Sequence, residues 1–494
     1  MGGRGPPAPS CLGRGDAMTA ASGGELGVEQ APLRVSLDVT AVPAQPVGAG
    51  RYVIDLLGAL MKRDDIALTL WCRRDDSERW GSLALEARTQ VAIRPAAPAA
   101  RPARLVWEQA RLPWLLGPRK VPAFRDLQGL EHRSSEGSIA DVHHSPHYTM
   151  PELARVPVVV TIHDLTFLDR PELHQRLKVP VFSRAIRQAA RRATALICVS
   201  EQTAVRLREH FEPAGRVFVV PHGVDLNRFT PDEPTPSGEH GSDGAVLARL
   251  GIRPPYVAFL GTIEPRKAVP VLVEAFDIVA ARHADLTLVL AGRPGWGNRE
   301  VDQAISVARH AARVTRLGYV PDDAVPVLLR RAAAVAYPAR EEGFGLPALE
   351  ALACGVPLVT TEGTVMADLA NGSDLANGSG LANGSGLASG SGLANGSGLA
   401  NGSGAKGPSS AAWLVSPGSV GELADALDQI VRGGSEVAER VRLGLEIAAQ
   451  HTWQASAAGH MAVYRFAANG SSAARLPGGS DHGRGVPRQV PPFR

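Results

Sequence analysis

The sequence contains few cysteines and no long run of apolar residues. Its four cysteines, at positions 11, 72, 198 and 354 of 494 residues, form no Cys-x-x-Cys pair, so a disulfide framework or a zinc site is not expected. No stretch approaches the roughly 18 apolar residues of a membrane-spanning helix, and the N-terminus lacks the apolar core of a signal peptide. The net charge of +3 is too small to favour nucleic acid as a partner. These absences predict a cytoplasmic protein that binds no nucleic acid.

Lysine is scarce, since the chain has only Lys62, Lys120, Lys178, Lys267 and Lys406, and arginine carries almost all of the positive charge. Hydrophobic residues make up 44% of the chain and charged residues 20%. These are values of a globular protein, and they exclude collagen, coiled coil and wholesale disorder. The length predicts two or three domains.

Glycine is in surplus, with 53 residues, but the surplus is local. Three low-complexity segments, 1–32, 369–404 and 470–494, hold 24 of these glycines, and the rest of the chain has an ordinary share. Segment 369–404 consists of six copies of Leu-Ala-Asn-Gly-Ser-Gly with two deviations. A six-residue period can also indicate a left-handed β-helix, but the stacked aliphatic or β-branched positions of such coils are absent. We therefore predict a flexible surface insertion.

Strand-like and helical patterns alternate along the remaining chain. Such alternation predicts an α/β fold with two doubly wound, mainly parallel sheets in tandem. The strand-like runs lie at 33–39, 66–72, 156–162, 195–200 and 217–220, and again at 256–260, 286–291, 314–317, 334–337 and 356–361. The predicted organisation is a disordered tail (1–32), a first domain (33–232) with an insertion near 118–139, a linker (233–249), a second domain (250–451), a last amphipathic helix (452–468) and a disordered tail (469–494).

The segment 337–350, Tyr-Pro-Ala-Arg-Glu-Glu-Gly-Phe-Gly-Leu-Pro-Ala-Leu-Glu, carries the clearest signal of chemistry. A strand leads into a loop with Gly343 and Gly345, and Pro347 suits the first turn of the helix that follows. The glycines let backbone amides approach a ligand, and a helix N-terminus attracts phosphate. Glu342 and Glu350 are eight residues apart, and each carboxylate can accept two hydrogen bonds from the vicinal diol of a sugar or ribose. The segment therefore predicts a site for a phosphorylated sugar compound.

This segment resembles the Glu-x7-Glu signature of the family 4 retaining glycosyltransferases, which have the GT-B fold of two facing Rossmann-like domains. The resemblance implies that Glu342 contacts hydroxyls of the donor sugar and Glu350 the nucleotide ribose. It also implies that backbone amides of Phe344, Gly345 and Leu346 lie near the diphosphate and that the backbone around Val320 lies beside the nucleobase. The final helix resembles the one that crosses back onto the first domain in this family. The first domain would then bind the acceptor and the second the nucleotide sugar.

A second segment, Gly261-Thr-Ile-Glu-Pro-Arg-Lys267, follows the first predicted strand of the second domain. Arg266 and Lys267 are adjacent cations at a strand end, where open α/β sheets bind ligands. They suit neutralising the charge of a departing diphosphate. A solvated basic turn is the alternative. Ala268 stands where members of the family often carry Asn.

Two segments of the first domain also resemble the family. His163, with Asp164, ends a predicted strand, and the resemblance places it at the donor sugar, where it helps stabilise charge in the transition state. Gly48 and Gly50 resemble the family's first glycine loop, which faces the diphosphate. They do not form the dinucleotide fingerprint, because Val53 stands at the third glycine position.

Histidines 143, 144 and 147 could indicate a metal, but no carboxylates support them, and we predict neither a metal nor a cofactor. No Asp-x-Asp triplet occurs in the chain, so the metal-bridged donor site of the other main transferase fold has no candidate.

The predicted function is transfer, with retention of configuration, of a hexose from a nucleotide-sugar donor to a glycan or lipid-linked acceptor. The Gly261–Lys267 segment looks most like mannosyltransferases that use GDP-mannose, with UDP-glucose or rhamnose donors as alternatives. A catalytically silent nucleotide-sugar-binding protein is a further alternative. A nicotinamide oxidoreductase lacks its Gly-x-Gly-x-x-Gly motif here. Peripheral contact with the inner face of the plasma membrane is a secondary prediction, made for the helically spaced arginines 184, 187, 191 and 192.

Overall fold

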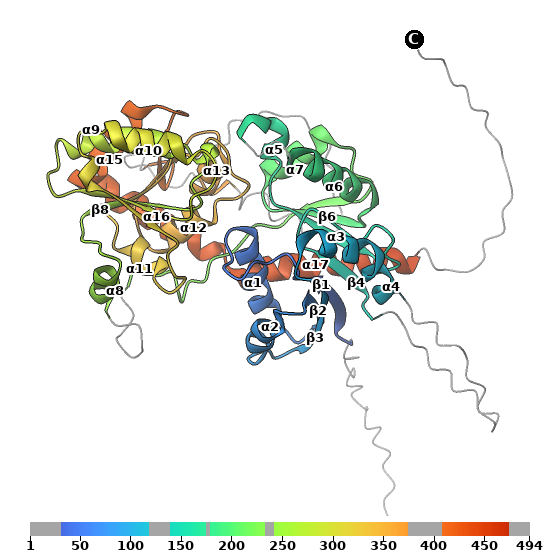
Figure 1. Cartoon of the computed structure of the whole chain (residues 1–494). Coiled ribbons are helices and arrows are strands. Elements are labelled where there is room, and N and C mark those ends of the chain that lie inside the picture. Colours follow the sequence, from blue (N-terminus) through green and yellow to red (C-terminus); the bar gives the residue numbers. More distant parts are fainter. Residues whose placement is uncertain (1–30, 118–138, 174–177, 233–241, 374–407, 474–494) are drawn as a thin grey trace, which may run out of the picture.

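The computed structural model describes residues 31–117, 139–173, 178–232, 242–373 and 408–473. Within these ranges the chain forms two parallel sheets, each flanked by helices, in two lobes (Figure 1). The predicted α/β fold with two doubly wound domains is confirmed. The predicted tails, the insertion near 118–139 and the repeat at 369–404 lie almost wholly outside the described residues.

The first sheet, in the described part of the chain, has seven strands in the order β3-β2-β1-β4-β5-β6-β7. These strands are β1 (Leu33–Asp38), β2 (Ile66–Arg73), β3 (Gln90–Ala97), β4 (Val142–Ser145), β5 (Val158–Ile162), β6 (Ala195–Cys198) and β7 (Arg216–Val219). The helices of this domain are α1 (Ala49–Leu60), α2 (Ser77–Ala84), α3 (Arg101–Ala110), α4 (Leu112–Leu116), α5 (Thr166–Asp169), α6 (Lys178–Arg192) and α7 (Glu201–His210).

The second sheet, counted over the same described ranges, has six strands in the order β10-β9-β8-β11-β12-β13. These strands are β8 (Tyr256–Leu260), β9 (Thr287–Ala291), β10 (Val314–Gly318), β11 (Ala334–Tyr337), β12 (Leu358–Thr361) and β13 (Ala412–Val415). The helices are α8 (Asp243–Arg249), α9 (Val269–Ala280), α10 (Asn298–Val307), α11 (Val325–Arg330), α12 (Leu346–Ala353), α13 (Val365–Ala370), α15 (Val420–Arg432), α16 (Ser435–Gln450) and α17 (Trp453–Ala473).

The strand order sets where a ligand can bind. In the first sheet β1 lies beside β4, and in the second β8 lies beside β11. All these strands are parallel, but the order in which the chain adds strands reverses at these two places, so the loops that follow the strands separate and leave a crevice at their carboxyl ends.

The strands predicted most clearly are those with continuous apolar runs. β5 and β8 are almost entirely buried and read as continuous apolar runs, as central strands of parallel sheets do. The sequence analysis did not predict β3, an edge strand that is partly exposed and contains Pro95, or β4, a central strand of only four residues. It also did not predict β13 or the capped part of segment 233–249, where Ser242 accepts a hydrogen bond from the Ala245 amide and begins α8.

The last helix, α17, returns to the first domain. Figure 1 draws it (red) across the strands of the first sheet, and its contacts include α1, β4, β5 and β6. Its apolar side chains belong to the core of that domain, namely Trp453, Ala457, Met461, Val463, Tyr464 and Ala467. None of the helices in the described residues is long and apolar enough to cross a membrane.

A buried chain of hydrogen bonds fixes α17 to the first sheet. Burial lowers the pKa of His460 to about 4, so its ring is neutral, and Nδ1 donates to a backbone carbonyl one turn earlier. His460 Nε2 therefore accepts from the Tyr52 hydroxyl at 2.8 Å. The Tyr52 oxygen can then accept from Thr161 Oγ1 at 3.0 Å, and Thr161 Oγ1 from His144 Nε2 at 2.8 Å. His144 Nδ1 accepts from the Tyr464 hydroxyl, so all these groups are paired in one direction.

Candidate active site

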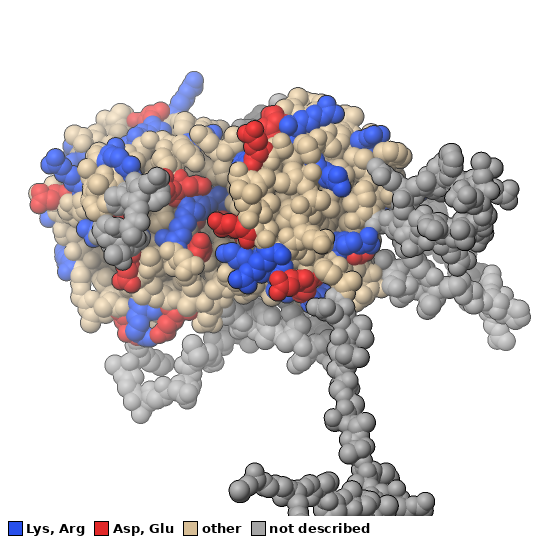
Figure 2. Space-filling view, turned by 90° about the horizontal axis from the view of Figure 1, so that it is seen from below, with Lys and Arg blue, Asp and Glu red and all other residues tan. Residues whose placement is uncertain are grey.

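A cavity of about 370 Å³ lies between the two domains. Loops that follow β1, β4 and β5 line one side, and loops that follow β8, β9, β10 and β11 line the other. Figure 2 shows acidic and basic side chains together along the hollow between the two lobes. The cavity therefore lies where both strand orders place a ligand.

The structure brings nearly all the predicted site residues to this cavity. The lining includes His163, Arg266, Lys267, Glu342, Gly48, Gly261, Val320, Phe344, Gly345, Leu346 and Glu350. Gly50 does not line it. Gly50 lies in the first turn of α1, and a Cβ there would lie 3.2 Å from Pro46 and 3.3 Å from Pro43. Gly50 thus allows the loop before α1 to fold closely against the helix.

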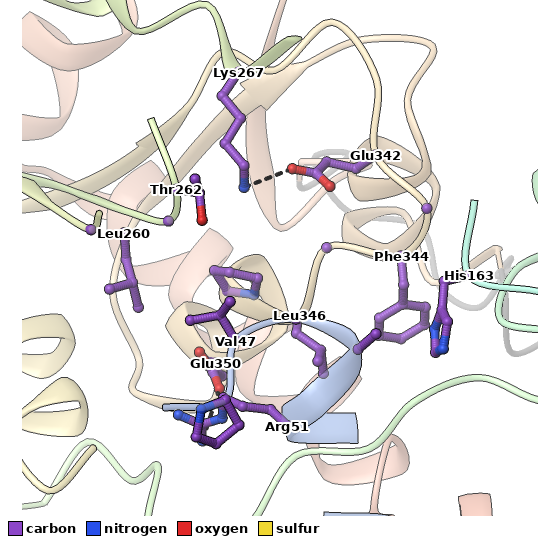
Figure 3. Close-up of a pocket in the computed structure, with 18 of the residues that line it drawn as sticks. Val47, Arg51, His163, Leu260, Thr262, Lys267, Glu342, Phe344, Leu346 and Glu350 are labelled. Carbon is purple, nitrogen blue, oxygen red and sulfur yellow. Dashed lines mark ion pairs between the residues drawn. The ribbon is translucent and has the colours of Figure 1, made fainter. Parts of the chain in front are cut away.

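One end of the cavity holds a cluster of charges around Glu342. Its carboxylate lies 2.6 Å from Arg266 Nη1 and 2.9 Å from Lys267 Nζ, and Glu264 lies 2.6 Å from Arg266. Figure 3 shows Lys267 and Glu342 pointing toward one another. Gly261 has a φ of 150°, and a Cβ there would lie 2.9 Å from Lys267 Nζ. Glycine at this position therefore leaves room for the lysine side chain to reach Glu342.

The charges of this cluster hold one another ionised. Burial acts to raise the pKa of Glu342, but Arg266 and Lys267 outweigh burial and lower it to about 2. Burial acts to lower the pKa of Arg266, but Glu342 and Glu264 raise it above its usual value. Both side chains are therefore charged at neutral pH. An incoming diphosphate would meet two cations already positioned by carboxylates.

Helix α12 begins beside this cluster. Its N-cap, Gly345, has a φ of 91°, which favours glycine, and a Cβ there would lie only 2.4 Å from Met366 Cγ. Pro347 stands in the first turn, where its lack of an N–H costs nothing. The free amides of this turn give the cavity a patch of positive potential.

Gly343 joins the two domains. A Cβ on Gly343 would lie 1.9 Å from the backbone oxygen of His163, and the Gly343 carbonyl accepts a hydrogen bond of 2.8 Å from Ser200 Oγ. The close approach requires glycine at 343 for a reason that the sequence analysis did not foresee. The loop of the second domain that holds Gly343 therefore packs directly on the end of the strand that carries His163. We call this close approach between Gly343 and His163 the Gly343 contact.

The other end of the cavity contains Glu350. Burial raises the pKa of Glu350 to about 7, against the lowering effect of Arg51 and Arg228. Arg51 Nη2 lies 3.6 Å from Glu350 Oε1, and Arg51 Nη1 lies 3.2 Å from Asp322 Oδ1. Figure 3 shows Arg51 and Glu350 together at this end, apart from Lys267.

His163 is held as one tautomer. Burial lowers the pKa of His163, so the ring is neutral, and Nε2 lies 2.9 Å from the Pro146 carbonyl, which can only accept. The hydrogen is therefore on Nε2, and Nδ1 carries a lone pair. The His163 ring packs edge-on to the Tyr52 ring, with 4.9 Å between the ring centroids, and lies next to Phe344 in Figure 3.

The sequence analysis missed several residues that line the cavity. Arg51 and Asp322 contribute charge from opposite domains, and His147 and His222 contribute ring nitrogens. In the described structure His147 Nε2 and His222 Nδ1 have no hydrogen-bond partner. Burial lowers the pKa of His147 to about 3 and that of His222 well below its usual value. His147 follows the end of β4, and this position was the signal in the sequence that could have placed it at the cavity.

The three histidines after Val142 do not gather as ligands. His143 Nδ1 pairs with Ser36 Oγ at 2.9 Å, and both nitrogens of His144 are occupied in the chain of hydrogen bonds to α17. Among the described residues no three His, Cys, Asp or Glu side chains are grouped to hold a metal ion.

Two family models, each of glycosyltransferases, match consecutive parts of the chain. Residues 46–228 match the family described as Glycosyltransferase Family 4, and residues 248–379 match Glycosyl transferases group 1. The chain belongs to glycosyltransferase family 4. Relatives within this family include the Escherichia coli O-antigen chain mannosyltransferase B, 29% identical over 46% of this chain and 58% of that protein. A D-inositol 3-phosphate glycosyltransferase of Mycolicibacterium gilvum is 37% identical over 41% of this chain and 45% of that protein.

This family 4 chain spans about half the length of these curated relatives. Among solved structures, the Anabaena protein HepE in complex with UDP and glucose has a TM-score of 0.57 at 17% identity, and the match covers 89% of this chain and 100% of that one. The glycosyltransferase WaaG, involved in lipopolysaccharide biosynthesis, has a TM-score of 0.57 at 13% identity and covers 87% and 99%. At these identities the likeness concerns the GT-B fold.

Proposed function

We propose that this chain is a retaining glycosyltransferase that moves a hexose from a nucleotide diphosphate sugar to an acceptor hydroxyl. The observation that carries the proposal is one cavity between two domains with paired cations at one end and a buried carboxylate at the other. A diphosphate requires the cations, and a ribose diol suits the carboxylate.

In this proposal the bond between the anomeric carbon and the diphosphate oxygen breaks while the acceptor oxygen bonds to the same face of the sugar. Arg266, Lys267 and the amides at the start of α12 take up the charge of the leaving diphosphate. Glu342 and the lone pair on His163 Nδ1 orient the sugar hydroxyls and support the positive charge that develops on the ring.

The acceptor's proton needs a destination in this proposal. The cavity histidines 147, 163 and 222 all have lowered pKa values because they are buried, so each of them is a weak proton acceptor. Glu342, with its pKa near 2, is an equally poor base. We propose, as the resemblance to family 4 implies, that the leaving diphosphate oxygen receives the proton and that no covalent intermediate with the protein forms.

We favour mannose from GDP-mannose as the donor and a glycan or glycolipid precursor as the acceptor. The support is the E. coli mannosyltransferase among the relatives. UDP-glucose is the main alternative, because HepE was solved with UDP-glucose. In this proposal Arg266, Lys267 and the free amides at the start of α12 hold the diphosphate without a metal ion.

The test is release of nucleoside diphosphate from GDP-mannose and UDP-glucose, with and without EDTA, and mass spectrometry of a lipid acceptor extract. Turnover of one donor, unaffected by EDTA, is the expected result. Lys267→Ala should abolish turnover and leave the circular dichroism spectrum unchanged. Near-normal turnover by that variant contradicts the assigned site, and donor binding without turnover by the unmodified chain favours the catalytically silent alternative.

Peripheral membrane contact is a secondary proposal, supported by the surface of α6. Its four arginines, 184, 187, 191 and 192, are all exposed, and Val181 on the same helix is 50% exposed. Basic and apolar side chains together favour an anionic bilayer surface. The chain should co-sediment with vesicles that contain anionic lipid, and failure to do so removes this proposal.

A further inference from the structure

Arg51 belongs to the first domain but lies against acidic groups of the second. It is the third residue of α1, in the loop-to-helix segment that begins with Gly48. Its side chain is 13% exposed, and its guanidinium lies 3.2 Å from Asp322 Oδ1 and 3.6 Å from Glu350 Oε1. The first domain supplies the cation of this ion pair and the second domain supplies the carboxylates, so each buried charge depends on its partner in the other domain.

Glu350 depends on its charged neighbours because the side chain of this glutamate is only 8% exposed. Burial opposes its ionisation, and Arg51 is the neighbour that favours ionisation most, followed by Arg228. Arg228 donates to the backbone oxygen of Asp322. The titratable and charged groups that interact with Glu350 come from α1, from the loops after β7 and before α11, from β11 and from α12 itself, and they are Arg51, Asp55, Arg228, Asp322, Tyr337 and Cys354.

The state of Glu350 matters for a nucleotide. A carboxylate accepts both hydroxyls of a ribose diol in charge-assisted hydrogen bonds, whereas a neutral carboxyl group accepts them more weakly. Loss of Arg51 would leave Glu350 buried without the cation that favours its charged form most.

We infer that Arg51 is a positioning residue for nucleotide binding, which reaches across the cleft to orient Glu350 and balance its charge. This inference rests on the proposed function and extends it, since the nucleotide end of the site then belongs to both domains. The second domain carries the carboxylate, and the first domain makes it able to accept the ribose.

The experiment is isothermal titration calorimetry of the full chain with GDP, UDP, ADP and dTDP. The variants are Arg51→Gln, Arg51→Lys, Glu350→Gln and the double variant Arg51→Gln/Glu350→Gln. Arg63→Gln serves as the matched control, because Arg63 follows α1 and pairs with Asp65 away from the cavity. Arg51→Gln should weaken binding of the preferred nucleotide about tenfold at pH 7, the difference expected for one charge-assisted hydrogen bond. Arg51→Lys should recover part of the loss.

Two readouts separate this role from a merely structural one. In the unmodified chain the affinity should rise as the pH passes through about 7, where Glu350 loses its proton. In Arg51→Gln this rise should move to higher pH. In the Glu350→Gln background, Arg51→Gln should have no further effect.

An equal loss of affinity in both backgrounds would show that Arg51 acts on the nucleotide without Glu350, and it would overturn the inference. So would a pH midpoint that does not move. If Arg51→Gln fails to fold, the pH midpoint of Arg51→Lys decides, since lysine pairs more weakly with the carboxylate and must still shift the midpoint upward. An unmodified chain that binds none of the four nucleotides overturns the proposed function together with this inference.

Discussion

Gly343→Ala should disable the enzyme although the change adds one methyl group and touches no charge. Real Cβ atoms essentially never approach a heavy atom within 3.0 Å, and the new Cβ would lie 1.9 Å from the His163 oxygen and 2.9 Å from the His163 carbonyl carbon. Both are backbone atoms that cannot rotate away. The two domains must therefore separate by about 1 Å at the Gly343 contact.

The magnitude follows from what this separation changes. His163 and the Glu342 cluster lie on opposite sides of the contact, so a shift of about 1 Å misplaces the sugar relative to the cations, which is worth roughly a hundredfold in rate. The overpacking should cost about 1–3 kcal/mol of stability, and a weakened hydrogen bond from Ser200 to Gly343 adds about 1 kcal/mol.

The assay is kcat/KM for donor turnover, with urea unfolding to measure stability. Gly421→Ala is the matched control, since Gly421 lies in α15 and a Cβ there has no heavy atom within 4 Å. That control should keep the full rate and gain up to about 1 kcal/mol, as Gly→Ala in a helix does. Wild-type activity in Gly343→Ala would refute the reasoning, because the domains would then be able to move apart without cost to the chemistry.

Three further substitutions test other parts of the structure. Glu342→Gln should reduce kcat about a hundredfold. The carboxylate of Glu342 adds to the free energy of unfolding of the native chain above pH 4.5, and this contribution is lost as the pH falls from about 4.5 to 2, so the variant should lack that part of the pH dependence. Tyr52→Phe should cost about 1–3 kcal/mol in urea unfolding, because His460 Nε2 loses its donor and Thr161 its acceptor. Ala268→Gly should raise stability by about 1 kcal/mol, because Ala268 has a left-handed φ of 49° that glycine adopts freely.

Each of these has a clear opposing result. Glu341→Gln is the control for the neighbouring position, since Glu341 pairs with Arg206 outside the cavity lining, and equal activity losses at 341 and 342 would contradict the role of the Glu342 cluster. An unchanged urea midpoint in Tyr52→Phe would mean that water replaces the hydroxyl. A destabilised Ala268→Gly would mean that the methyl group packs better than its backbone conformation costs.

The predictable parts of this molecule are those encoded locally. Buried parallel strands such as β5 and β8 read as apolar runs, and the glycines before α12 line the cavity, where their pattern predicts a site. Partnerships between distant segments could not be read in the same way. Nothing in the pattern around Arg51 points to Glu350, and only the fold brings them within 3.6 Å. Gly343 was interpreted as room for a ligand, whereas its closest neighbour is the other domain.

The return of α17 has a consequence for how the protein is made. The last strand of the first sheet, β7, ends at Val219, but the helix that completes the core of that domain begins at Trp453. During translation the strands of the first domain emerge from the ribosome first, and the entire second domain follows. Only then does α17 emerge and cover the apolar face of the first domain. The first domain must remain incomplete throughout translation of the second, so a chain that terminates before Trp453 would keep every cavity-lining residue and still lack a finished first domain.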